Sequence, residues 1–392
     1  KPTTDGHFWP DITAADFAGY DQRLYSDEFE GRKQRTIGDR MTTTYLIDQF
    51  KSMGLKPGNG DSYLQSVPAV ETTLLDGDAV SLDVSEGGKV EKYNYRGDLI
   101  CVTLHGVPDV TVKDAAMVFA GYGIVAPEYH WNDYAGINVK GKVVLVMVND
   151  PGFGTADTSI FKGSTMTYYG RWTYKYEEAA RQGAKGILVI HNTTAASYPF
   201  SVVQNSWGSS NLFLDESKDP VYHCPFEGWV SADAAKKLLA AAGKDSSLLM
   251  QANKPGFKAI SLHEKLSTTL HVKTRYNNSE NVIAKITGSK RPDEYIIYTA
   301  HWDHFGIGQP DKNGDSIYNG AIDNASGTAA LLEMARAFKN NTVKPERTIL
   351  FIAVTSEEQG LLGSEYYSSH PLYPLNKTVA DLNMDIVNAN RK

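Results

Sequence analysis

Two apolar runs, each followed at once by acidic and imidazole side chains, constrain the fold of this chain more than any other feature. The runs are EYIIYTA at residues 294–300 and TILFIAV at residues 348–354. Both are continuously apolar, which is typical of central strands that helices cover on both faces. We therefore expect an α/β fold with a doubly wound, mostly parallel sheet, in which ligands bind beyond the carboxyl ends of the strands.

Acidic and imidazole side chains gather at the predicted strand ends and at the start of the intervening helix. They are His301, Asp303, His304, Asp323, Glu357, Glu358 and Asp385. Glu357 and Glu358 are adjacent, and two like charges about 4 Å apart repel by ~1 kcal/mol in water and by more near an apolar interior. A cation would offset this repulsion, so the paired glutamates predict a metal site.

Each of these residues taken alone also has a simple structural interpretation. A histidine at a strand end is more often hydrogen bonded than a ligand, Asp323 could be a helix N-cap, and a Glu-Glu pair is usually solvated. Their shared place at successive strand ends favours a divalent cation with nitrogen and oxygen ligands, most often zinc, in an open catalytic site. His304 stays open between a ligand, a cleft residue and a hydrogen-bond partner of the ligands.

Composition excludes several classes of protein. The net charge is -7 and no basic run occurs, so nucleic acid is not an expected partner. No window approaches the roughly 18 apolar residues of a membrane span. The chain opens at Lys1 rather than Met. A removed leader would explain this and would make the protein secreted or periplasmic, which we expect, although trimming of the sequence explains it equally well. Cys101 and Cys224 would either form one disulfide or remain two buried thiols, and we favour the thiols.

The chain has 392 residues, more than the roughly 250 to 300 at which single cores stop growing, so we expect more than one domain. We predict an N-terminal part of the main domain at 1–110, an inserted and smaller α/β domain at 111–262, and the main core at 263–392. Helix signals occur near residues 39–53 and 325–338.

Four motifs in the last segment carry a family resemblance: HWDHFG from His301, NGAIDNASG from Asn319, TSEEQGLLGSEYY from Thr355 and NMDIV from Asn383. With them, the segment resembles the dinuclear zinc aminopeptidase family that also includes glutamate carboxypeptidase. The resemblance implies a zinc-dependent exopeptidase acting on peptides, first of all an aminopeptidase. The alternatives are a glutamate-carboxypeptidase-like enzyme, a cyclase-like acyltransferase and a non-catalytic receptor on the same fold.

The resemblance also implies roles for single residues. The implied metal ligands are His301, Asp323, Glu358 and Asp385. Asp323 would bridge two zinc ions, Glu357 would be the general base, and Asp303 would orient His301 from behind. The peptide bond after Asp323 is often cis in this family.

Two further expectations follow from the same resemblance. The stretches at 121–146 and 177–192 resemble the protease-associated domain, a frequent insertion in this family that carries no catalytic groups. The family pattern supplies a final histidine ligand of the second zinc from downstream of the NMD motif, whereas this sequence stops at Lys392. A fragment, an ending supplied by another polypeptide and a naturally reduced variant would each explain this, and we favour the fragment. We expect two zinc ions in the complete site and one or none in this chain. Oligomeric state is left open.

Overall fold

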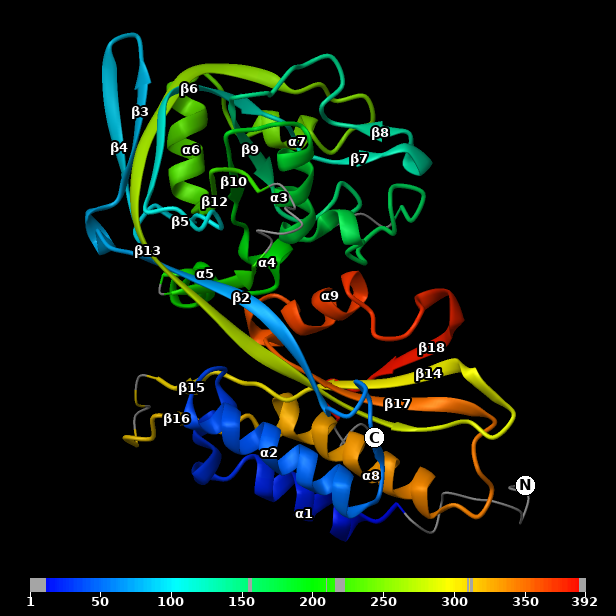
Figure 1. The fold of residues 1–392 in the computed structure, drawn as a ribbon. Helices are drawn as coiled ribbons and strands as arrows, with labels where there is room; N and C mark the ends of the chain where they lie inside the picture. Colours follow the sequence, from blue (N-terminus) through cyan, green and yellow to red (C-terminus); the bar gives the residue numbers. More distant parts are fainter. Residues whose placement is uncertain are drawn as a thin grey trace. The chain divides into compact units, whose positions relative to one another are not determined.

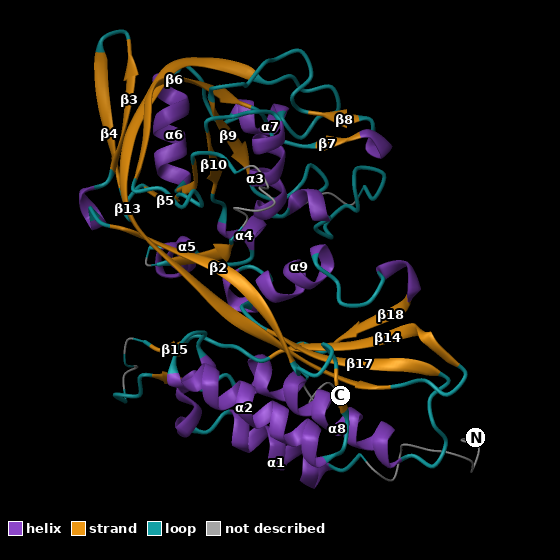
Figure 2. Cartoon of the chain, in the orientation of Figure 1, coloured by secondary structure: helices purple, strands orange, loops and turns teal. Residues whose placement is uncertain are grey.

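The computed structural model describes residues 12–153, 157–208, 210–215, 223–308, 310 and 313–387. The chain divides into two compact units. Unit 1 comprises Lys1–Ala69, Phe213–Asp215 and Tyr276–Lys392, and unit 2 comprises Val70–Leu212 and Glu216–Arg275. Both units mix helices and strands, which confirms the predicted α/β class (Figure 2).

Unit 1 contains a sheet whose central strands are parallel. β14 (Arg291–His301) pairs in parallel with β17 (Arg347–Val354) on one side and with β18 (Thr378–Asn383) on the other. The end of β13 (Ile260–Ile286) pairs antiparallel with β17, and β1 (Lys56–Pro57) pairs antiparallel with β13. The two apolar runs are thus the central strands β14 and β17.

Helices cover both faces of this sheet (Figure 1). α1 (Ala14–Leu24), α2 (Ile37–Ser52) and α8 (Ser326–Asn340) lie on one face, and α9 (Leu362–Ser369) lies on the other. The α2 and α8 face buries a cluster that includes Leu46, Phe50, Trp302, Leu331 and Phe351. The α9 face buries Ile283, Ile297, Leu350, Ile352, Val354 and Tyr367. Alternate residues of β17 therefore enter opposite cores, which explains its continuously apolar sequence.

Unit 2 contains its own largely parallel sheet. β6, β9, β10 and β12 pair in parallel, while β5 and the first part of β13 pair antiparallel with β12 and β6. The strands are β5 (Leu99–Val102), β6 (Asp109–Phe119), β9 (Val143–Met147), β10 (Gly186–Ile190) and β12 (Phe226–Val230). The longer helices are α3 (Trp172–Arg181), α5 (Phe200–Trp207) and α6 (Ala232–Ala241).

The boundaries of unit 2 differ from the predicted 111–262. The hairpin of β3 (Ser81–Glu86) and β4 (Lys89–Asn94) pairs with β13, and β5 pairs with β12, so residues from Val70 onward belong to this unit. It is consequently the larger of the two units within this chain, not the smaller. Its identity as a protease-associated domain stays a prediction.

Two expectations from composition concern the cysteines and a membrane span. Cys101 and Cys224 are buried free thiols, as favoured from the sequence, and burial raises the pKa of Cys101 to about 12. Among the described residues, no helix combines the length and apolar character required to cross a membrane.

A buried acid in unit 2 lacks a partner. Glu264 on β13 is 1% exposed, and neither of its carboxyl oxygens has a hydrogen-bond partner in the described part of the chain. It lies where the β13 to β6 register shifts, between Ser261 and Lys265. The pKa of Glu264 is raised from 4.5 to about 7, mainly by burial and also by the charges of Glu86 and Glu91 on the neighbouring hairpin.

Glu264→Gln will reduce the loss of stability that the protein shows as pH rises from about 4.5 to about 7. In that range the unfolded chain has already released the Glu264 proton while the folded chain retains it, so the free energy of unfolding falls as pH rises. Above pH 7 this pKa shift lowers the free energy of unfolding by at most about 3 kcal/mol. Thermal midpoints at pH 5 and pH 8 measure the effect, with the exposed Glu365→Gln on α9 as control. Equal pH dependence in wild type and Glu264→Gln would contradict it.

Candidate metal centre

Parallel strands of unit 1 deliver the predicted site residues to one edge of the sheet. His301 is the last residue of β14, and the short helix η7 (Glu357–Gln359) begins three residues after β17. Asp385 follows β18 by two residues, and Asp323 lies in the turn Ala321–Ala325 that leads into α8. Carboxyl ends of parallel strands share an edge, which is why residues so far apart in sequence meet.

His301, Asp323 and Asp385 form a first group of candidate ligands, whose donor atoms lie within 4.8 Å of one another. His301 Nε2 is 3.1 Å from Asp323 Oδ1 and 3.5 Å from Asp385 Oδ1. His301 is 3% exposed, yet Nε2 has no hydrogen-bond partner among the residues described. An unpaired buried polar atom costs about 1–3 kcal/mol. An imidazole nitrogen and two carboxylates facing one point fit a zinc ion.

The tautomer of His301 follows from its other nitrogen. His301 Nδ1 lies 3.1 Å from the backbone oxygen of Asp303, and a carbonyl oxygen can only accept. Nδ1 therefore carries a proton, and with a metal ion bound Nε2 would present its lone pair on the side of Asp323 and Asp385. This is the arrangement in which a zinc-binding histidine is oriented by a hydrogen bond from its second nitrogen.

His304, Asp323 and Glu358 form a second group within the same 4.8 Å limit. His304 Nδ1 is 2.5 Å from Glu358 Oε1. Asp323 belongs to both groups, which matches the bridging role that the resemblance implies.

The local fold around Asp323 rules out the helix-cap interpretation of this residue. The Asp323-Asn324 peptide bond is cis, as the resemblance implied. Ala325 is the N-cap of α8, and Asn324, not Asp323, contacts its first turn, because Asn324 Oδ1 accepts from the backbone N–H of Gly327 at 2.9 Å. Asn324 Nδ2 donates to the backbone oxygen of Met384 at 2.9 Å, which ties this turn to the residue before Asp385. Asp323 is thereby free to face His301.

Glu357 belongs to neither ligand group of the described residues, although Glu357 Oε2 is 3.9 Å from His301 Nε2. Its pKa is raised to about 7, mainly by burial. The charge of His301 opposes this shift, and the charges of Glu358, Asp303 and Asp385 add to it. A carboxylate with a pKa near neutrality can accept and return a proton at neutral pH. The two adjacent glutamates thus take different positions.

Asp303 contacts both His301 and the turn that carries the two glutamates. Its carboxylate oxygen is 3.8 Å from His301 Nδ1, and only its backbone oxygen is within hydrogen-bond distance of that atom. The carboxylate instead accepts from the backbone N–H of Glu357 at 3.0 Å and of Glu358 at 3.3 Å, and from Gln34 Nε2. Asp303 therefore fixes the turn that carries both glutamates, because those N–H groups point at it.

All six predicted site residues fall within residues 281–392, and this range matches the model of Peptidase family M28. We call residues 281–392, the range that this family model matches, the M28 segment.

Relatives of known name match the chain over part of its length. The mouse protein named Aminopeptidase NAALADL1 is 34% identical over 140 residues, which cover 34% of this chain and 17% of that protein. The Caenorhabditis elegans Glutamate carboxypeptidase 2 homolog is 39% identical over 132 residues, covering 32% and 16%. A Probable zinc metalloprotease of Pyrenophora teres f. teres (strain 0-1) is 38% identical over 110 residues, covering 28% and 23%. The chain spans about a quarter or less of each relative.

The M28 segment is held in place by a residue that the sequence did not single out, Arg32. Arg32 is fully buried in η2 (Asp27–Arg32), and burial lowers its pKa to about 10. Its guanidinium donates to the backbone oxygens of Leu24, Trp302, Asn319 and Gly320 at 2.6–2.9 Å. It thus joins the loop after β14 to the loop before Asp323. The FEGRKQRT stretch around it contains no motif that could have announced this role.

Exposed apolar side chains are sequence neighbours of the M28 ligand groups and of the turn that carries the glutamates. Phe305 follows His304, Ile322 precedes Asp323, and Ile386 follows Asp385. Each of the three is about half exposed, as is Leu361 at the start of α9. Exposed apolar side chains that gather beside polar groups mark a binding surface. We call Phe305, Ile322, Leu361 and Ile386 the apolar rim.

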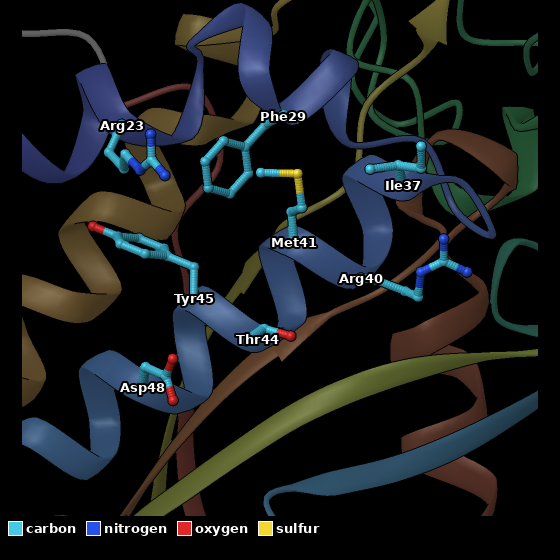
Figure 3. Close-up of a pocket in the computed structure, with 8 residues that line it drawn as sticks. All are labelled: Arg23, Phe29, Ile37, Arg40, Met41, Thr44, Tyr45 and Asp48. Atoms are coloured by element: carbon cyan, nitrogen blue, oxygen red, sulfur yellow. The ribbon is translucent and has the colours of Figure 1, made fainter.

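A separate hollow of about 390 Å³ lies on α2 and the segment before it (Figure 3). Phe29 and Tyr45 pack edge to face there at 5.8 Å, and Arg23 lies over the Phe29 ring at 5.0 Å. None of the candidate ligands lines this hollow, so it is not the reaction site.

Proposed function

We propose that the M28 segment is the catalytic core of a zinc-dependent exopeptidase that removes N-terminal residues from peptides. The observation that carries the proposal is the buried, unpartnered Nε2 of His301 facing Asp323 and Asp385, with Glu357 beside it. The relatives named as an aminopeptidase and as a zinc metalloprotease support it.

Some of these residues would bind metal, and Glu357 would transfer a proton. His301, Asp323 and Asp385 would hold one zinc ion, and Asp323 and Glu358 would take part in holding a second. When bound, zinc polarises the scissile carbonyl and lowers the pKa of the attacking water. Glu357 accepts the proton of that water and returns it to the leaving amine. Asp303 keeps Glu357 in reach by binding its backbone N–H.

The surroundings favour apolar substrates over acidic ones. The apolar rim offers contact to an apolar side chain beside the scissile bond. Arg32 is the guanidinium that contacts the metal loops, and its donors are already engaged by backbone oxygens, so it is not available to bind a substrate carboxylate. A glutamate-carboxypeptidase-like activity, the second candidate, would need such a group.

A panel of peptide substrates will show this preference. With zinc bound, we expect kcat/KM for a leucyl or phenylalanyl substrate to exceed that for an aspartyl or glutamyl one by at least about tenfold, the difference of one well-placed apolar contact. We expect N-acetylation of the same substrates to abolish hydrolysis, because an aminopeptidase binds the free amine. Faster hydrolysis of N-blocked peptides ending in glutamate would instead support the carboxypeptidase. Zinc binding without hydrolysis of either set would support the receptor.

Export of the protein and the protease-associated identity of unit 2 stay predictions from the sequence. Peptide is the substrate class that the family match of residues 281–392 supports.

A further inference from the structure

We infer that His304 is a direct ligand of the second metal ion, together with Asp323 and Glu358. The inference rests on the proposed function, because it assumes a zinc enzyme. The family resemblance places the remaining ligand of this ion on a histidine downstream of Asp385 and gives His304 no role. The structure offers His304 as an imidazole donor at that place.

The donor atoms of the second group are already close together. One atom each of His304, Asp323 and Glu358 lies within 4.8 Å of the others, and His304 Nδ1 is 2.5 Å from Glu358 Oε1. The side chains of His304 and Glu358 are both only 11% exposed. The hydrogen bond keeps both donors on one side of Asp323, whose carboxylate is shared with the first group.

The ring of His304 is fixed by backbone on one face. Gly320 has a φ of +60°, and a Cβ there would lie 2.6 Å from the Cγ and Cδ2 atoms of His304. The ring therefore packs directly against the Gly320 backbone. Arg32 hydrogen bonds to both Gly320 and His304. Its Nη2 donates to the backbone oxygen of Gly320 at 2.8 Å, and its backbone oxygen accepts from the N–H of His304 at 3.4 Å. A pre-organised ring of this kind is what a metal ligand requires.

The charge of the site also favours a second cation. Asp323, Glu357 and Asp385 place three carboxyl groups within 3.9 Å of His301 Nε2, and Glu358 faces His304. The Asp303 carboxylate accepts from the backbone N–H groups of both glutamates. One divalent ion leaves part of this negative charge uncompensated at short range. His304 as a neutral ligand completes an imidazole and two carboxylates for the second ion, the same donor set as the first group.

A competing interpretation makes His304 a positioning residue. Protonated His304 could pair with Glu358 and replace the second ion by its own charge, in an enzyme with a single zinc. The two interpretations differ in metal stoichiometry, which can be measured without any substrate.

The test is a zinc titration of the metal-free 392-residue chain, with a competing chelator and with bound zinc counted by mass spectrometry. With His304 as a ligand we expect wild type to bind two zinc ions, more than the one or none expected from the sequence. We expect His304→Ala and His304→Gln to keep the affinity for the first zinc ion and to lower the affinity for the second by more than about 100-fold. A loss of about 100-fold is the upper end of what is typical when a residue that only orients a ligand is removed. His304→Gln retains a hydrogen-bond donor for Glu358, so a positioning role would leave its second ion nearly intact.

The exposed His370→Ala is the matched control, since this ring stacks on Tyr366 at 4.4 Å within α9 and its C-cap and should leave both affinities unchanged. Circular dichroism checks that each variant is folded. One zinc ion in wild type, or a second ion equally tight in both variants, overturns the role of His304 and leaves the first ion standing. A chain that binds no zinc at all overturns the proposed function as well.

Discussion

Glu357→Gln will bind zinc as tightly as wild type and will lower kcat for peptide hydrolysis by about 10³-fold. The amide keeps the shape of the side chain but cannot accept a proton from the attacking water, and a general base typically contributes about 10²–10⁴-fold. Glu357 belongs to neither ligand group, so the metal should stay. The measurement pairs bound zinc per chain with kcat on a free-amine leucyl substrate.

The matched control is Glu365→Gln, an exposed glutamate on α9 that should leave both quantities unchanged. Two outcomes would contradict the assignment. Unchanged kcat in Glu357→Gln would mean that another group takes the proton, and loss of zinc would make Glu357 a ligand instead of a base.

Asp323→Ala will lose zinc from both positions, because both candidate ligand groups use its carboxylate. We expect each zinc affinity to fall by more than about 100-fold, beyond the usual effect of losing a residue behind the ligands. Hydrolysis should fall to background with it. Zinc per chain after dialysis and kcat/KM on a leucyl substrate measure the two effects.

Asp385→Ala provides the sharpest comparison with Asp323→Ala, because Asp385 belongs only to the first group. It should weaken one ion and spare the other. The exposed Asp293→Ala on β14 is the control for loss of a carboxylate as such. An Asp323→Ala protein that retains one ion at full affinity would show that the carboxylate does not bridge.

The placement of the site residues could be predicted because simple patterning determines it. β14 and β17 are continuously apolar, so they had to be central strands, and His301 and Glu357 had to emerge at or near their carboxyl ends. The helix at residues 325–338 was expected for the same reason and extends from Ser326 to Asn340. Parallel strands then bring these ends to one edge, whatever the length of chain between them.

Other features leave no trace in a single sequence. Arg32 and Gln34 act on backbone oxygens and on Asp303, and such contacts require no motif or periodicity. The division at Val70 was missed because pairing of β3 with β13 joins residues about 180 positions apart, and local patterning contains no register information. The carbonyl bond to His301 was missed because the sequence does not show which oxygen of Asp303 faces the ring.

The guanidinium contacts of Arg32 bear on how the protein reaches its folded state. Arg32 hydrogen bonds to residues 270, 287 and 288 positions further along the chain. Such contacts raise the contact order, and chains dominated by distant contacts fold slowly. During synthesis Arg32 cannot form these three bonds until β14 and the loop that ends at Gly320 have left the ribosome. Competence to bind metal should therefore be one of the last properties acquired in refolding, later than helix content, and chaperones would act in that interval.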